Sequence, residues 1–164
     1  MSKLFDVALE WLNQEEWSFS EHRSDDSDNA WIKANYVADN ARFDIVFDVY
    51  EDIEIFSLYI YFPVNVPENK RLAVADLLTR INWGMRVGNF ELNMDDGLIR
   101  CKAVVDIEGS TLVTTMITNM LRAVLSTADK YFPMIMQVCY SDKTAKDLLA
   151  TEDSALTEEV KTLQ

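Results

Sequence analysis

The chain has 164 residues, of which 49% are apolar and 26% are charged, and its formal net charge at pH 7 is −13. This length fits a single domain whose core is large enough to fold without a metal ion or a disulfide. Only 4 glycines and 3 prolines occur, which leaves little material for low-complexity linkers or glycine-rich phosphate loops. The acidic balance argues against binding to nucleic acid or to an anionic membrane, because both need clustered lysine and arginine.

The negative charge is concentrated in the first part of the chain. Residues 1–66 carry 14 acidic and 4 basic side chains, whereas residues 67–130 carry 8 of each. Such an excess either keeps the protein soluble or forms an acidic face that steers a basic partner.

Two features of the sequence indicate the cellular compartment. Asp6 and Glu10 interrupt the N-terminal apolar run, and no segment reaches the roughly 18 apolar residues that span a bilayer. Cys101 and Cys139 each lie in an apolar stretch, and neither belongs to a CxxC motif. We therefore expect a cytoplasmic protein with two buried, reduced thiols.

The first predicted elements are a helix and a meander of strands. Residues 4–13 repeat apolar side chains at helical spacing behind a Ser2 cap, and a short strand is expected at 17–21. The polar run 22–29 predicts a loop, because its aspartates lack the glycine and the bidentate acid of a calcium-binding loop. Alternating apolar residues predict three further strands, at residues 31–38, 42–50 and 53–62.

The strand predicted at residues 53–62 is apolar on both of its faces. Tyr59 and Tyr61 lie on one face, and Phe56 and Leu58 lie on the other. Such a strand is either central in the sheet with helices over both faces, or it offers one face to a partner subunit. We favour the central position and keep the partner surface as the alternative.

A helix and a hairpin are predicted next. The helix begins at Pro67 and ends at Gly88, and its buried stripe comprises Leu72, Val74, Leu77, Leu78, Ile81 and Met85. Alternating apolar residues on both sides of Asp95-Asp96-Gly97 predict a β-hairpin over residues 90–105.

A long helix is predicted after the hairpin. It starts at Gly109-Ser110 and runs to Tyr140, with a kink or restart at Pro133. Residues 143–150 predict a further short helix. Four methionines in this region either fill the core or line an adaptable groove, namely Met116, Met120, Met134 and Met136.

The predicted order of elements is α-β-β-β-β-α-β-β-α. Runs of antiparallel strands separated by helices indicate an α+β fold, in which an antiparallel sheet carries flanking helices. We expect residues 1–150 to form one domain and residues 151–164 to form an acidic, loosely held tail.

Catalytic motifs are absent from the sequence. His22 is the single histidine, and none of the motifs GxGxxG, GxxxxGK[ST] or GxSxG occurs. The paired acids have structural explanations, since they mark a solvent-exposed strand face, a hairpin turn and a strand end: Asp44/Asp48, Asp95/Asp96 and Asp106/Glu108. We therefore predict a protein that is not an enzyme and has no cofactor and no metal site.

Residues 67–140 carry the motifs of a known family. They are the Asn82–Gly84 helix end, the strand entry Gly88–Leu92, the turn Asp95–Gly97 and the run Tyr131–Pro133. With these motifs the chain resembles the YbjN family, described as bacterial sensory-transduction regulators. The resemblance implies a fold like that of type III secretion chaperones, which often pair as dimers, and it supplies no catalytic residue.

These observations together predict a non-enzymatic, protein-binding or chaperone-like adaptor or regulator with a protein partner. The alternative is a regulatory domain that senses a small molecule in a pocket between sheet and helices. We further expect a homodimer that uses the 67–87 helix and the 53–62 strand. The candidate partner or dimer surface comprises Phe56, Leu58, Tyr59, Tyr61, Trp83 and Met85.

Overall fold

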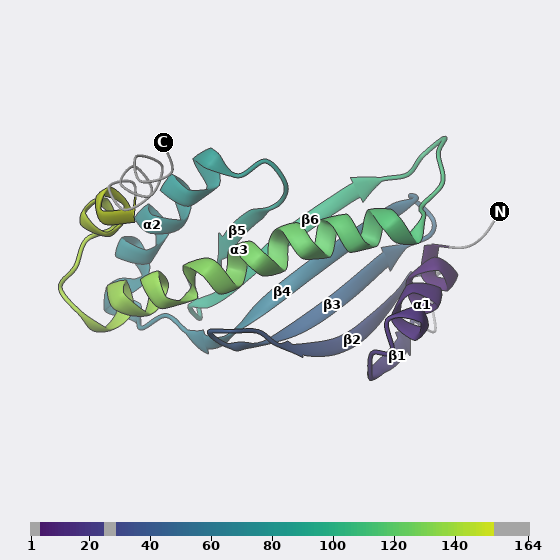
Figure 1. Ribbon diagram of the computed structural model, residues 1–164, viewed down its shortest axis with the longest axis horizontal. Helices are drawn as coiled ribbons and strands as arrows, with labels where there is room; N and C mark the ends of the chain where they lie inside the picture. The colour runs from purple at the N-terminus through teal and green to yellow at the C-terminus, as the bar shows by residue number, and fades with distance from the viewer. Residues whose placement is uncertain (1–3, 25–28, 153–164) are drawn as a thin grey trace, which may run out of the picture.

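The computed structural model describes residues 4–24 and 29–152, and its centre is a six-stranded antiparallel sheet in the order β1-β2-β3-β4-β6-β5. The strands are β1 (Phe19–Arg23), β2 (Asn29–Val37), β3 (Arg42–Tyr50), β4 (Ile55–Asn65), β5 (Asn89–Leu92) and β6 (Leu98–Asp106). The helices are α1 (Leu4–Gln14), η1 (Glu68–Lys70), α2 (Arg71–Gly84) and α3 (Thr114–Tyr140), and residues 145–152 are also helical (Figure 1). The predicted α+β fold and the predicted order of elements are confirmed.

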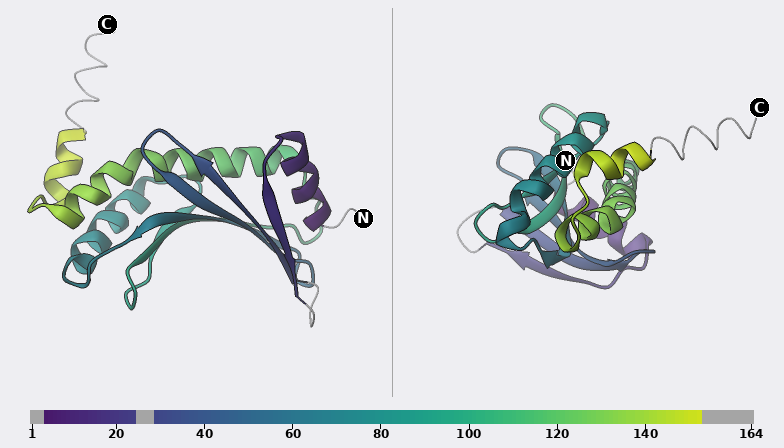
Figure 2. Two further views of the ribbon diagram at one scale, coloured as in Figure 1. Left: turned by 90° about the horizontal axis from the view of Figure 1, so that it is seen from below. Right: turned by 90° about the vertical axis from the view of Figure 1, so that its left-hand side faces the viewer.

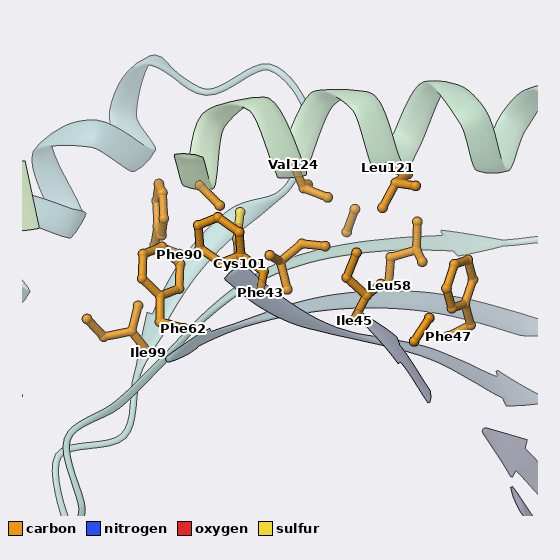
Figure 3. Packing of buried hydrophobic residues seen from close by; sticks show 14 of the residues in the cluster. Phe43, Ile45, Phe47, Leu58, Phe62, Phe90, Ile99, Cys101, Leu121 and Val124 are labelled. Carbon is orange, nitrogen blue, oxygen red and sulfur yellow. The ribbon is translucent and has the colours of Figure 1, made fainter. Parts of the chain in front are cut away.

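One face of the sheet forms the floor of the core. The alternation seen in the sequence places apolar side chains of neighbouring strands side by side, as where Phe47 pairs with Leu58 across β3 and β4. Both side chains and the neighbouring Ile45 are fully buried. Figure 3 shows them pointing toward α3, from which Leu121 and Val124 complete the packing.

The helices of the described chain lie on this same face of the sheet (Figure 2). Helix α1 packs against β3, α2 packs against β5, and α3 crosses the sheet over β4 and β6. The opposite face has no helix over it, and in the left view of Figure 2 it lies inside the bend of the long strands. The sheet is therefore covered on one side only.

Helix α3 differs from its prediction at two points. It begins at Thr114 rather than at Gly109, because Gly109 has a φ of 71°, which a right-handed helix does not accommodate. It also continues without a break through Pro133. Phe132 packs against the rings of Phe43 and Phe62 at 6.1 and 6.0 Å between centroids, and these contacts hold the helix in place around the proline.

Other boundaries shift by a few residues. Strand β1 begins at Phe19 rather than at residue 17, because Trp17 instead stacks on Tyr36 and contacts Trp11 edge-on. Strand β4 runs past Pro63 to Asn65 through an irregularity in its pairing with β6. The end of a strand next to such an irregularity tolerates proline, because the ladder hydrogen bond is already interrupted there.

Helix α1 is capped by a residue that the sequence did not indicate. The backbone N–H groups of Leu4 and Phe5 donate to the carboxylate of Glu51, at 3.2 and 2.9 Å. Glu51 belongs to the turn between β3 and β4, so this contact fastens the helix to the sheet. The predicted Ser2 cap lies outside the described residues, as do residues 25–28 of the polar loop and the tail from residue 153 onward.

Helix α2 buries most of the stripe predicted for it. Val74, Leu77, Leu78 and Ile81 are buried, whereas Leu72 is 80% exposed. The prediction for Leu72 is wrong because residue 72 lies two positions before the buried Val74, about 200° around the helix axis, and therefore on the solvent side.

Candidate functional site

The face of the sheet without helices is the candidate functional site, and we call it the open face. It is built from alternate positions of five strands. Its residues are Trp31, Lys33, Asn35, Val37, Arg42, Asp44, Val46, Asp48, Tyr50, Ile55, Ser57, Tyr59, Tyr61, Asn89, Glu91, Arg100, Lys102, Val104 and Asp106. Val37, Val104 and Trp31 are the most exposed apolar side chains among them, at 71%, 46% and 40%.

The structure divides the candidate residues of β4 between the two faces. Phe56 and Leu58 are fully buried beneath the helices, so the prediction that they belong to a partner surface is wrong. Tyr59 and Tyr61 lie half-buried on the open face. Strand β4 is central, as predicted, but helices cover one of its faces rather than both.

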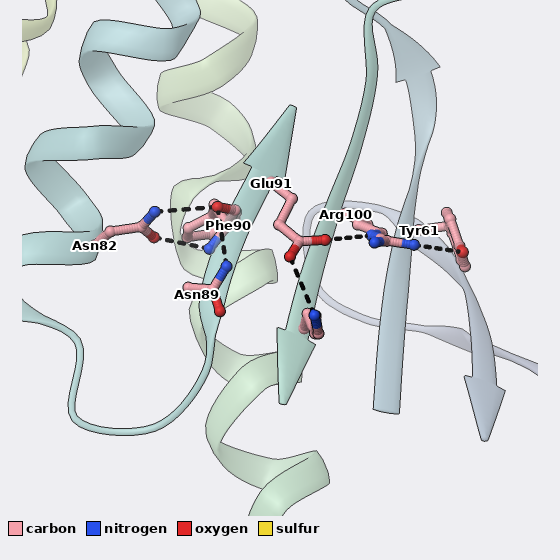
Figure 4. Close-up of polar contacts among 7 residues, drawn as sticks. Tyr61, Asn82, Asn89, Phe90, Glu91 and Arg100 are labelled. Atoms are coloured by element: carbon pink, nitrogen blue, oxygen red, sulfur yellow. Dashed lines mark hydrogen bonds and ion pairs between the residues drawn. The ribbon is translucent and has the colours of Figure 1, made fainter. Parts of the chain in front are cut away.

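Arg100 is the centre of a polar cluster on the open face. Strand pairing places it between Tyr61 on β4 and Glu91 on β5. Its Nε donates to Glu91 Oε2 at 2.5 Å, and its Nη1 donates to the Tyr61 hydroxyl at 3.3 Å (Figure 4). Its guanidinium also lies 4.4 Å from the centre of the Tyr59 ring, and Lys102 pairs with Glu91 at 3.5 Å.

The cluster fixes the charges of its members. Partial burial alone would raise the pKa of Glu91, but the hydrogen bond and the charge of Arg100, together with Lys102, outweigh it and lower that pKa. Burial likewise works against the charge of Arg100, and its contacts with Tyr61 and Glu91 raise its pKa in spite of it. This cluster was not predicted from the sequence, although Glu91, Arg100 and Lys102 alternate with the buried residues of the predicted hairpin.

A second polar contact lies across the sheet on β3. The Tyr50 hydroxyl donates to Asp48 Oδ2 at 2.8 Å. This hydrogen bond, followed by burial and by the negative charge of Asp48, raises the pKa of Tyr50 to about 12. At the β1–β2 end, the rings of His22 and Trp31 stack 5.4 Å apart. The open face therefore carries rings along most of its width.

The open face is close to neutral in a strongly acidic chain. Four of its side chains are acidic and four are basic: Asp44, Asp48, Glu91 and Asp106 against Lys33, Arg42, Arg100 and Lys102. At its β5–β6 end a hollow of about 340 Å³ opens beside the Arg100 cluster, lined by Tyr61, Glu91, Leu92, Asn93, Leu98 and Arg100.

The remaining candidate residues lie elsewhere. Trp83 on α2 is 94% exposed, and Met85, just after the helix, is half-buried. Helix α2 lies on the helix-covered side of the sheet, so the structure does not bring these residues together with Tyr59 and Tyr61.

The paired acids take part in local structure. Asp96 Oδ1 accepts from the backbone N–H of Leu98 in the hairpin turn, and Asp106 Oδ1 accepts from that of Glu108. In residues 4–24 and 29–152, no three histidine, cysteine or acidic side chains are grouped as a metal site would require. The four methionines of α3 are partly buried against the core, which favours core filling over an adaptable groove, the two roles that the sequence left open.

The two cysteines are unpaired and buried, as expected. Burial raises the pKa of the Cys101 thiol to about 12, and it also raises that of Cys139. Both are poor nucleophiles at neutral pH. Among the described helices, none is long and apolar enough to cross a membrane.

Comparisons with known proteins agree with this fold. The solved structure of YbjN from E. coli, described as "a putative transcription regulator", superposes with a TM-score of 0.52 at 13% sequence identity, over 82% of this chain and 89% of that one. At this identity the likeness shows a shared fold. No curated protein matches the chain. The family model for YbjN, described as "Putative bacterial sensory transduction regulator", matches residues 5–137, and the chain therefore belongs to the YbjN family.

Proposed function

We propose that this YbjN-family chain is a non-enzymatic regulator that binds another protein through its open face. The observation that carries the proposal is the Arg100 cluster beside Tyr59 and Tyr61. Tyrosine, tryptophan and arginine are the side chains that contribute most to protein–protein binding when a partner excludes water from them. Here they lie on a face of the sheet that no described helix covers.

The charge of the open face supports a protein partner rather than a nucleic acid. A nucleic-acid site gains its affinity from an excess of lysine and arginine, whereas the open face has four basic and four acidic side chains. A partner protein that offers apolar side chains and charges of both signs fits this surface. For this chain we therefore propose regulation through protein contacts. We place this activity in the cytoplasm, which two unpaired cysteines support.

The experiment compares three immobilised proteins in pull-downs from a lysate of the source bacterium, followed by titration of the purified interactor. Wild type and Tyr140→Asp should retain the same interactor, because Tyr140 is 67% exposed at the end of α3, on the helix-covered side of the sheet. Tyr59→Asp should weaken its binding about thirtyfold or more, since it buries a charge at the centre of the contact. Equal affinities for all three proteins would refute the open face as the binding site.

A second candidate function is the sensing of a small molecule, and the hollow beside Arg100 favours it. Its volume of about 340 Å³ lies near the lower end of the range for ligand pockets, about 300–1,000 Å³. Leu92 and Leu98 supply apolar walls, while Arg100 and Asn93 supply polar groups. A thermal-shift screen against metabolites supports this candidate if a compound stabilises the wild type but not Arg100→Ala. A screen without such a compound leaves protein binding as the function.

A further inference from the structure

A second hollow lies on the helix-covered side of the sheet, between α3 and the turn that joins β2 to β3, and we call it the turn hollow. Its volume is about 500 Å³, within the range of ligand pockets, about 300–1,000 Å³. The turn lies beside α3 in both Figure 1 and Figure 2. Spacings of three and four residues place one stripe of α3 along this hollow, namely Arg122, Leu125, Ser126 and Asp129.

The apolar part of the turn hollow is a ring that its neighbours hold in place. The Tyr36 ring stacks on the Trp17 ring, with 5.4 Å between centroids and 20° between planes. Trp17 in turn contacts the buried Trp11 edge-on at 5.3 Å. The Tyr36 side chain is still 41% exposed, and it lines the hollow together with Leu125. This wall suits an apolar group, because a ring that is already held loses little freedom when the group binds.

The position of the turn is fixed by an acidic side chain of α3. The Asp129 carboxylate accepts from the backbone N–H of Asn40 at 2.8 Å and from its Nδ2 at 3.1 Å. Asn40 Nδ2 also donates to the Asp129 carbonyl oxygen at 3.2 Å. Asp39 directly precedes Asn40, so these contacts also hold the backbone of Asp39 beside the hollow that its side chain lines.

Two opposite charges line the turn hollow without neutralising each other. Arg122 and Asp39 are both exposed, and neither makes an ion pair or a hydrogen bond with another described residue. The other charged residues of the hollow have partners, since Asp129 holds the turn and Lys130 pairs with Glu152 at 2.5 Å. A ligand with one positive and one negative group can therefore pair with both free charges at once. Arginine is well suited to the negative group, because it binds a carboxylate through two parallel hydrogen bonds.

We propose that the turn hollow binds a free α-amino acid with an apolar side chain. Its carboxylate pairs with Arg122, its ammonium group pairs with Asp39, and its side chain packs on the ring of Tyr36. This site is separate from the open face and from the hollow beside Arg100, because it lies on the other side of the sheet. Since both charged side chains are exposed to water, we expect a modest Kd of about 0.1–1 mM.

Three probes that share a phenyl ring test the need for both charges. They are L-phenylalanine, phenylpropionate, which lacks the ammonium group, and phenylethylamine, which lacks the carboxylate. Each is titrated into the full chain, and binding is followed by the NMR shifts of the backbone amides. L-Phenylalanine should shift the amides of Asn40 and of residues 122–129, and L-leucine should shift the same amides. Each single-charge analogue should bind about tenfold more weakly or worse than L-phenylalanine.

Variants of the two charged residues test the location of the site. Arg122→Gln and Asp39→Asn should each weaken the binding of L-phenylalanine about tenfold or more. Both side chains are exposed, so the variants should fold, which circular dichroism verifies. Arg86→Gln is the matched control and should bind like the wild type, because Arg86 is also exposed, has no partner among the described residues and lies outside the hollow.

Four results would each overturn the proposal. The first is that neither amino acid shifts the amides around the hollow at about 10 mM, well above the expected Kd. The second is that a single-charge analogue binds as tightly as L-phenylalanine. The third is that Arg122→Gln and Asp39→Asn bind like the wild type. The fourth is that binding is lost in Arg100→Ala but kept in Arg122→Gln, which would place the amino acid in the hollow on the open face.

Discussion

At the scale of single residues, the backbone geometry of Gly97 limits what the hairpin turn accepts. Gly97 has a φ of +80°, and its carbonyl accepts from the N–H of Val66 at 2.8 Å. A Cβ built at this position would lie 2.2 Å from the Val66 carbonyl oxygen, a backbone atom that cannot turn aside. The turn therefore needs glycine for its conformation and for the close approach of a second strand.

We expect Gly97→Ala to lower the free energy of unfolding by about 2–4 kcal/mol, because strain in the turn adds to the clash with Val66. Urea unfolding measures the change. Gly84→Ala is the matched control, since nothing lies within 4 Å of its added Cβ, and it should change stability by less than about 1 kcal/mol. Equal effects of the two substitutions would contradict the argument.

Cys101 and Tyr50 lead to an expectation about alkaline pH. Burial raises the pKa of Cys101 from its ordinary value of 9.0 to about 12, and the hydrogen bond to Asp48 raises that of Tyr50 from 10.0 to about 12. The folded protein keeps these protons at pH values where the unfolded chain loses them. Their contribution to stability is therefore complete below pH 9 and declines as the pH rises toward 12.

Chemical unfolding between pH 8 and 11 should show this decline. Cys101→Ala should make the decline shallower, because the unfolded state then has one proton fewer to release. The variant has its own packing loss at pH 8, so the slope with pH is the quantity compared. A slope identical to that of the wild type would show that the burial of Cys101 has no effect on the loss of stability at alkaline pH.

At the scale of elements, Asn82 closes an exposed edge of the sheet. Strand β5 is the last in the order, so one side of it has no neighbouring strand. The Asn82 side chain accepts from the N–H of Phe90 at 2.7 Å and donates to its carbonyl at 3.0 Å (Figure 4). This side-chain amide takes the place of a further strand and fastens the end of α2 to β5.

Asn82→Ala should therefore destabilise the protein by about 1–3 kcal/mol, since it leaves a half-buried N–H and carbonyl without their partner. Asn89→Ala is the control. Its side chain also donates to the Phe90 carbonyl, but over a longer 3.4 Å, and we expect a loss below about 0.5 kcal/mol. Hydrogen exchange at the Phe90 amide should quicken in the first variant and stay unchanged in the second.

The sequence could predict most elements because their periodicity is local information. Alternation in residues 42–50 matches the bounds of β3, and the Asp-Gly turn placed the hairpin correctly. The contacts made by Glu51 and Asn82 join segments far apart along the chain, and no local pattern shows which remote group a carboxylate or amide meets. The Arg100 cluster was missed for the same reason, since it depends on the order in which β4, β6 and β5 pair.

At the scale of the whole molecule, coverage of the sheet on one side explains why β4 is apolar on both faces. Its inner face packs under α3, and its outer face carries Tyr59 and Tyr61 as its large side chains beside Ile55. Tyrosine stays compatible with water through its hydroxyl, so the open face persists in solution and still has rings for a partner to cover. The sequence pattern alone could not separate this arrangement from a sheet covered on both sides.

Two opposing electrostatic effects act in the folded protein. One is the repulsion that follows from its net charge of −13, and the other is the attraction within its ion pairs. Folding brings 28 acidic side chains together, and their mutual repulsion weakens as salt screens it. The ion pairs of the described residues, such as Arg80–Asp76 and Arg100–Glu91, are at least partly exposed and contribute about 0–1 kcal/mol each, which salt also reduces.

We expect the repulsion to dominate, so the midpoint of thermal unfolding should rise between 0.02 and about 0.3 M sodium chloride. Glu15→Lys should raise the midpoint at low salt, because Glu15 is exposed at the end of an acidic helix that contains no basic residue. That gain should shrink at high salt, as a screened charge effect must. A midpoint that falls with salt would instead mean that the ion pairs around Arg100 outweigh the repulsion, and Arg100→Gln would then remove the dependence.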